Sequence, residues 1–121
     1  MSLLDAVIAG KLGRANGDSG GEIDVSVSGA SPTISPNDRT LYICGELTSL
    51  TLSGLPASGL FEIVFKSGST ATEVTLPANV LLPDGVSVEA DTIYDISVRV
   101  CAVAGTTYGL AAMQGWQVPG A

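Results

Sequence analysis

The side chains that could do chemistry in this chain are few, and histidine is absent. A serine or cysteine nucleophile needs a neighbouring base, which is histidine in the common hydrolases. Cys44 and Cys101 therefore lack such a base, and the trypsin-like string GDSGG at residues 17–21 is a chance match. The sequence gives no support to nucleophilic catalysis, and we expect no enzyme activity.

Carboxylates come closest to a catalytic or metal-binding spacing. Glu22 with Asp24, and Glu89 with Asp91, stand two residues apart, which places each pair on one face of a strand. Glycosidases hold two carboxyl groups across a cleft, and no pattern indicates a cleft, so solvated charges at strand ends are favoured. The set Asp18, Glu22 and Asp24 fits no EF-hand spacing, so a solvated linker is favoured over a calcium loop. We expect no metal and no cofactor.

The charge of the chain argues against two classes of partner. The net charge is −7, with only five lysines and arginines among 121 residues. Binding to a phosphate backbone or an anionic membrane surface depends on clustered cations, so neither nucleic acid nor membrane is an expected partner. The longest apolar stretch, residues 3–12, contains Asp5 and Lys11 and is shorter than the roughly 18 residues that span a bilayer.

The elements that would position these residues begin with a short helix, expected over Ser2–Leu12. Ser2 is a suitable N-cap, and apolar residues at helical spacing form a stripe made of Leu4, Val7, Ile8 and Leu12. A flexible Gly-rich linker, Gly13–Gly21, follows. Because such a short helix is marginal alone in water, its stripe must pack on something. Two interpretations stay open: an anchor to a partner, and a helix folded back onto its own domain.

From Glu22 to Val118 the pattern is that of β-strands. Apolar and polar residues alternate in short runs about 8–12 residues apart, which is typical of a β-sandwich or a small jelly-roll-like barrel. Gly45 is expected to mark a bulge or a bend, and residues 67–70 are expected to form a hairpin-like turn. We therefore divide the chain into residues 1–21, the anchor helix and linker, and residues 22–121, an all-β domain.

The longest expected strand lies within Glu89–Gly109. Its alternation predicts an inward face made of Tyr94, Ile96, Val98, Val100 and Ala102. The other face carries Asp95, Ser97, Arg99 and Cys101. Cys44 lies on a different expected strand, so a bridge to Cys101 is open. Two reduced thiols in a chain assembled in cytoplasm are favoured, because no classical export signal is recognisable.

Two aromatic residues of the final expected strand, Thr106–Val118, are candidates for contact with other molecules. Trp116 and Tyr108 would each present a large apolar side chain with a polar group. Such side chains are common in contacts with glycans and with other subunits. For Trp116, burial against the core or a subunit is favoured over an exposed platform for sugars.

Two stretches, residues 40–80 and 88–116, resemble a β-domain that recurs in structural proteins of tailed phages and prophages. The matching motifs are, in order, Tyr42, Cys44–Glu46, Thr48–Leu50, Phe65–Thr70, Thr75–Pro77, Glu89–Tyr94, Tyr108–Gly109 and Trp116. The string LLDAVIAGKLG with its Gly-rich continuation also looks like the start of many small virion proteins. The chain departs from the family pattern at Asp95, where glutamate is usual, and in continuing past Trp116.

The resemblance implies a virion structural protein, assembled in the host cytoplasm, that decorates the capsid as a cement protein or head fibre. Its expected partner is the major capsid protein or another virion protein, contacted through Leu4, Val7, Ile8 and Leu12. It also implies a homotrimer formed by the β-domain. The alternative is a tail-fibre or baseplate adhesin that binds host glycans, through Trp116 first. An enzyme acting on cell-wall polymers is a third hypothesis, disfavoured by the missing histidine.

Overall fold

The computed structural model describes residues 22–83 and 86–119, and within these ranges it contains strands and no helix. One sheet has six strands in the order β1-β3-β5-β8-β9-β7, and a second has three in the order β2-β4-β6. The bounds are β1 Ile23–Val27, β2 Thr33–Ile34, β3 Thr40–Leu47, β4 Ser49–Leu52, β5 Gly59–Ser67, β6 Glu73–Thr75, β7 Val80–Leu81, β8 Thr92–Val103 and β9 Thr106–Gln117.

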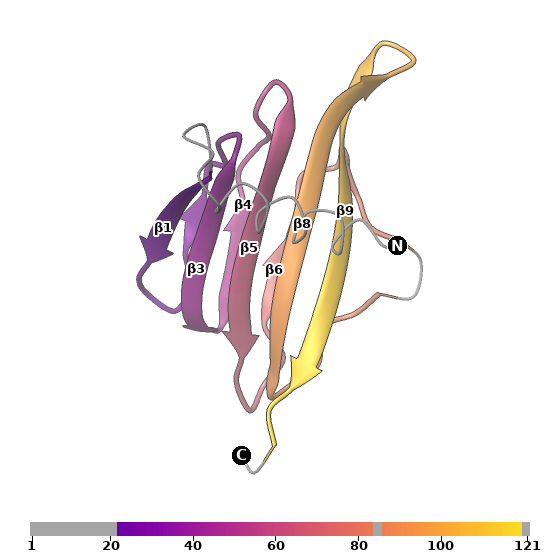
Figure 1. Cartoon of the computed structure of the whole chain (residues 1–121). Coiled ribbons are helices and arrows are strands. Elements are labelled where there is room, and N and C mark those ends of the chain that lie inside the picture. Colours follow the sequence, from indigo (N-terminus) through magenta and orange to yellow (C-terminus); the bar gives the residue numbers. More distant parts are fainter. Residues whose placement is uncertain (1–21, 84–85, 120–121) are drawn as a thin grey trace.

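The two sheets form two layers, with the small sheet behind the large one in Figure 1. The all-β class is therefore confirmed, and the layering is consistent with the expected β-sandwich. The expected helix Ser2–Leu12 and the linker Gly13–Gly21 lie outside the described residues. The division of the chain at residue 22 stays a prediction.

Strand direction is where the structure departs from expectation. From β1 to β6, consecutive strands alternate between the two sheets, so β1, β3 and β5 become parallel neighbours in one sheet. The strands β2, β4 and β6 are parallel in the other. The chain thus makes three stacked coils of two strands each. A jelly roll consists of antiparallel strands, so that alternative does not fit this part of the fold.

Residues 67–70 do not form the expected hairpin. They carry the chain from β5 in the large sheet to β6 in the small one, so the two flanking strands do not pair. Small turn residues are equally suited to a hairpin and to a crossing between sheets, which is why the sequence pattern gave the wrong connection. The expected bulge at Gly45 is confirmed, because the β3–β5 register shifts between Ile43 and Glu46.

The core lies between the two sheets. Its buried apolar side chains are Ile34, Tyr42, Leu47, Leu50, Leu52, Phe61, Ile63, Phe65, Val80, Tyr94, Ile96, Val98, Val100 and Ala111. The expected inward face of β8 is confirmed from Tyr94 to Val100. Ala102 is exposed, because it lies where the β8–β9 hairpin extends past the other strands (Figure 1).

The tip of the β8–β9 hairpin offers a test of local strain. Ala104 and Gly105 form the two-residue turn, with φ angles of 52° and 84°. Positive φ at both positions is the pattern of a type I′ turn, which favours asparagine or glycine at the first position and penalises alanine. Ala104→Asn is expected to raise the free energy of unfolding by about 0.5–1 kcal/mol, measured by urea denaturation. Ala102→Asn, on the same exposed hairpin arm, should give no gain, and an equal gain there would contradict the turn explanation.

Candidate functional site

The surface of the large sheet that points away from the small sheet is the first candidate site, and we call it the outer face. Register places Glu62 of β5 between Leu41 of β3 and Ser97 of β8. Two residues further along β5, Val64 stands opposite Asp95 of β8. These residues alternate with core residues along each strand, so their side chains point outward.

The centre of the outer face is unusually well buried. Glu62 and Ser97 are 0% exposed, and Asp95 is 7% exposed. The outward direction predicted for Asp95 and Ser97 is therefore correct, but burial of both faces of β8 was not foreseen. A sequence pattern reports the direction of a side chain and does not report how deeply a polar side chain is buried.

One end of the outer face carries exposed apolar side chains beside Lys66 of β5, which pairs with Glu46. Ile93 of β8 stands directly opposite Trp116 of β9, and their exposed fractions are 37% and 45%. Ile43 on β3, 42% exposed, belongs to the same face. Burial of Trp116 against the core, one of the two favoured placements, is therefore wrong, because its strand position points it away from the second sheet. Contact of Trp116 with another subunit stays a prediction.

The two aromatic contact candidates share a face but not a site. Tyr108 pairs with Cys101 near the hairpin tip, and Trp116 pairs with Ile93 near the other end of β9. Eight residues of strand separate them by roughly 27 Å. A single sugar ring cannot contact both, so each would have to act alone.

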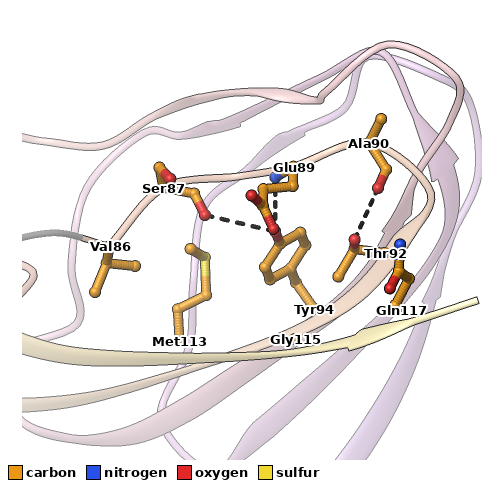
Figure 2. Close-up of a pocket in the computed structure, with 9 residues that line it drawn as sticks. All are labelled: Val86, Ser87, Glu89, Ala90, Thr92, Tyr94, Met113, Gly115 and Gln117. Atoms are coloured by element: carbon orange, nitrogen blue, oxygen red, sulfur yellow. Dashed lines mark hydrogen bonds between the residues drawn. The ribbon is translucent and has the colours of Figure 1, made fainter.

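A pocket of about 700 Å³ opens on the opposite, inner side of β8 and β9. Figure 2 shows the loop before β8 along one side of it and β9 along the other, with the Tyr94 ring reaching from β8 towards the loop. The lining residues are Val86, Ser87, Glu89, Ala90, Thr92, Tyr94, Met113, Gly115 and Gln117. Gly115 leaves room for the ring, since a Cβ there would lie 2.8 Å from Tyr94 Cε1.

The loop of this pocket is held by the Tyr94 hydroxyl. The Glu89 amide donates a hydrogen bond to that oxygen at 2.6 Å, and the hydroxyl donates to the Ser87 carbonyl at 3.5 Å. Thr92 Oγ1 donates to the Ala90 carbonyl at 2.8 Å, and Asp91 adopts a φ of 52°. The polar groups nearest the ring are thus already engaged in fixing the backbone.

The same turn occurs a second time, before β3. There the Asn37 amide donates to the Tyr42 hydroxyl at 2.9 Å, and that hydroxyl donates to the Ser35 carbonyl at 3.5 Å. Thr40 Oγ1 donates a hydrogen bond to the Asp38 carbonyl at 3.2 Å, and Arg39 has a φ of 56°. Both copies share the spacing Ser-x-x-x-x-Thr-x-Tyr, at 35–42 and 87–94. Sequence reasoning missed this repeat, although its spacing is visible in the sequence.

The chemistry available in the pocket is limited. Glu89 contributes the one carboxylate among its described lining residues, and Asp91, its expected neighbour, is not among them. The described residues contain no group of three or more potential metal ligands, and Asp18 of the weighed calcium set lies outside them. The pocket can hydrogen-bond a polar molecule, but a general acid paired with a base is not found in its described lining.

The two cysteines are free thiols. Cys44 on β3 packs against the core, whereas Cys101 on β8 belongs to the outer face, and β5 separates the two strands. A bridge between them is not formed, in agreement with the favoured expectation of thiols.

The burial of Cys44 predicts a contribution to stability that depends on pH in the alkaline range. Burial raises the pKa of its thiol above the ordinary value of 9.0. A raised pKa in the folded state means that this contribution to stability is complete below pH 9.0 and is lost as the pH rises through the folded pKa. At pH 8 we expect iodoacetamide to alkylate Cys44 several-fold more slowly in the folded chain than in urea, because thiolate and access are both reduced. Equal rates in the two states, read by mass spectrometry, would contradict this.

No protein-family model, curated protein or solved structure matches this chain. No helix in residues 22–83 and 86–119 is long and apolar enough to cross a membrane. The candidate sites therefore rest on the geometry of the outer face and the pocket. The anchor candidates Leu4, Val7, Ile8 and Leu12 lie outside the described residues and stay predictions.

Proposed function

We propose that this chain is a bacteriophage virion structural protein that decorates the capsid surface, as a cement protein or head fibre. Residues 1–21 anchor it to the major capsid protein or a neighbouring virion protein. The β-domain forms a homotrimer, and the protein has no catalytic role. The sequence motifs given above supply the phage assignment.

The main support for a structural role is the pair of exposed apolar side chains at one end of the outer face. Ile93 and Trp116 form an exposed cross-strand pair, and exposed apolar groups of this kind mark surfaces that meet other proteins. Charged residues make up only 14% of the chain, which suits close packing between subunits. A pocket lined by one described carboxylate adds no competing case for catalysis.

The deciding experiment is cryo-electron microscopy of the purified parent particle, with this chain traced in the map. Three copies grouped on the capsid lattice, with residues 2–12 against the capsid protein, are the expected result. Density on the tail, or particles that lack the chain, would overturn the capsid assignment. Sedimentation of the free protein tests the trimer independently, against the chain mass of 12.2 kDa.

A tail-fibre or baseplate adhesin is the second candidate, and the 45% exposure of Trp116 favours it. An exposed indole can stack on a sugar ring. A glycan array should then give a signal that Trp116→Ala removes and Tyr108→Ala retains, because the two side chains lie at opposite ends of β9. An array without signal would remove this candidate.

A further inference from the structure

The last strand of the large sheet has an open edge over much of its length. β9 spans Thr106–Gln117 and lies at one side of the large sheet in Figure 1. Of the described strands, only the two-residue β7 pairs with the side of β9 that faces away from β8, at Gly109 and Leu110. Residues 114–117 are exposed. The sheet therefore ends at an accessible strand beyond the short β7.

Two hydrogen bonds show which backbone groups point to the open edge. The Val118 amide donates to the Asp91 carbonyl, just before β8, at 2.9 Å, and the Gly109 amide donates to the Asn79 carbonyl, just before β7, at 2.9 Å. Because backbone groups alternate between the two sides of a strand, the even-numbered residues of β9 bond to β8. The odd-numbered residues point the other way, and those beyond β7 are Ala111, Met113, Gly115 and Gln117.

This edge lacks the features that protect sheet edges from further pairing, which are shortness, charge and proline. The opposite edge, β1, has five residues and contains Asp24. The small sheet ends at β2, of two residues, and at β6, which contains Glu73. β9 has 12 residues with neither charge nor proline. Residues 100–121 contain no charged residue at all, although the chain has 12 acidic and five basic ones. Among the described edges, β9 is the one best suited to accept a further strand.

We propose that a second copy of this chain supplies that strand. The two β9 edges pair antiparallel around a two-fold axis at Gln114, so that the sheet continues from one copy into the other. This register sets Ala111 opposite the partner's Gln117 and thus uses the whole free edge. The inference does not rest on the virion role, and a trimer built through another surface would keep these edges open.

The side chains along this edge are complementary in size to their own two-fold images. On the outer face, Trp116, which is 45% exposed in the single chain, stands opposite the partner's Ala112. On the inner side, Met113 stands opposite the partner's Gly115. Gln114 meets its own image, and two amide side chains can donate and accept hydrogen bonds with each other. A two-fold interface requires such self-complementarity, which is why a second copy fits this edge better than an unrelated strand.

The first test is oxidation of the full chain carrying Gln114→Cys. At the two-fold axis this position faces itself in a non-hydrogen-bonded pair, where two cysteines are close enough for a disulfide. We expect a linked dimer of twice the chain mass of 12.2 kDa on a denaturing gel without reductant. Thr107→Cys is the matched control, because it is exposed on the same strand beyond the paired edge, and it should not link. Equal linking of both variants, or linking of neither, would overturn the proposal.

Amide hydrogen exchange gives an independent readout. In the single chain, the Met113 and Gly115 amides point away from β8. Pairing should slow their exchange by about tenfold or more, and dilution should remove that protection. Gln114→Lys sets two like charges opposite each other and should also remove it, whereas Thr107→Lys adds the same charge elsewhere and should leave it unchanged.

Fast exchange at Met113 and Gly115 in the concentrated, unmodified protein would contradict the pairing. Protection that persists in Gln114→Lys would contradict the register at Gln114. Absence of the chain from virions would overturn the proposed function and leave the pairing intact, because linking and exchange are measured on the free protein.

Discussion

Replacing Gly59 with alanine is expected to lower the free energy of unfolding by roughly 3 kcal/mol. Gly59 begins β5 with a φ of 112°, and an added Cβ would lie 1.8 Å from Asp38 Oδ1. That oxygen accepts a hydrogen bond from the Leu60 amide at 3.0 Å, so moving it aside removes a second interaction. Urea denaturation of the full chain measures the loss.

Gly54 provides the matched control for this substitution. A Cβ at Gly54 would meet nothing within 4 Å, and its φ is not in the left-handed region. Gly54→Ala should therefore change stability by no more than about 0.5 kcal/mol. A comparable loss of stability at both positions would mean that backbone movement relieves the crowding at Gly59. The crowding would then not be the cause of the loss.

Phe65→Ala is expected to cost about 4 kcal/mol and also to loosen the pocket loop. The Phe65 ring is 1% exposed and stacks on Tyr94, with centroids 5.6 Å apart. Because the Tyr94 hydroxyl holds the Glu89 amide, a displaced ring releases that hydrogen bond. Denaturation measures the stability, and hydrogen exchange of the Glu89 amide measures the loop.

Removing single tyrosine hydroxyls separates the loss of core packing from the loosening of the pocket loop. Tyr94→Phe keeps the ring and should cost about 1 kcal/mol while speeding exchange at Glu89. Tyr42→Phe removes the matching hydroxyl before β3 and should cost a similar amount without changing exchange at Glu89. If Phe65→Ala cost no more than Tyr94→Phe, the assignment of the ring to the core would be wrong.

The sequence predicted the longer strands well because their alternation is strong, whereas the two-residue strands β2 and β7 were not predicted. The inward residues of β8 up to Val100 lie where the period of two placed them, and Gly45 marks a real shift of register. Strand direction could not be predicted in this way, because a strand has the same pattern whether its neighbour runs parallel or antiparallel. Direction depends on the loops, and small polar loop residues suit both kinds of connection.

The candidate sites were less predictable than the fold. The role of Trp116 as a contact residue stays a prediction, and its exposure follows from the register of β9 against β8, which no local pattern encodes. The burial of Glu62 could not be predicted, because residue type alone places glutamate in solvent. The pocket arises from a loop that the sequence indicates only by its prolines and glycines.

The β8–β9 hairpin also has a consequence for engineering. Its turn at Ala104 and Gly105 projects past the rest of the sheet, and the residues around it are exposed (Figure 1). Exposed loop tips of this kind accept inserted peptides with little cost to the host domain. A peptide epitope inserted between these two residues would stand clear of both sheets, at the end of the molecule opposite the exit of β9.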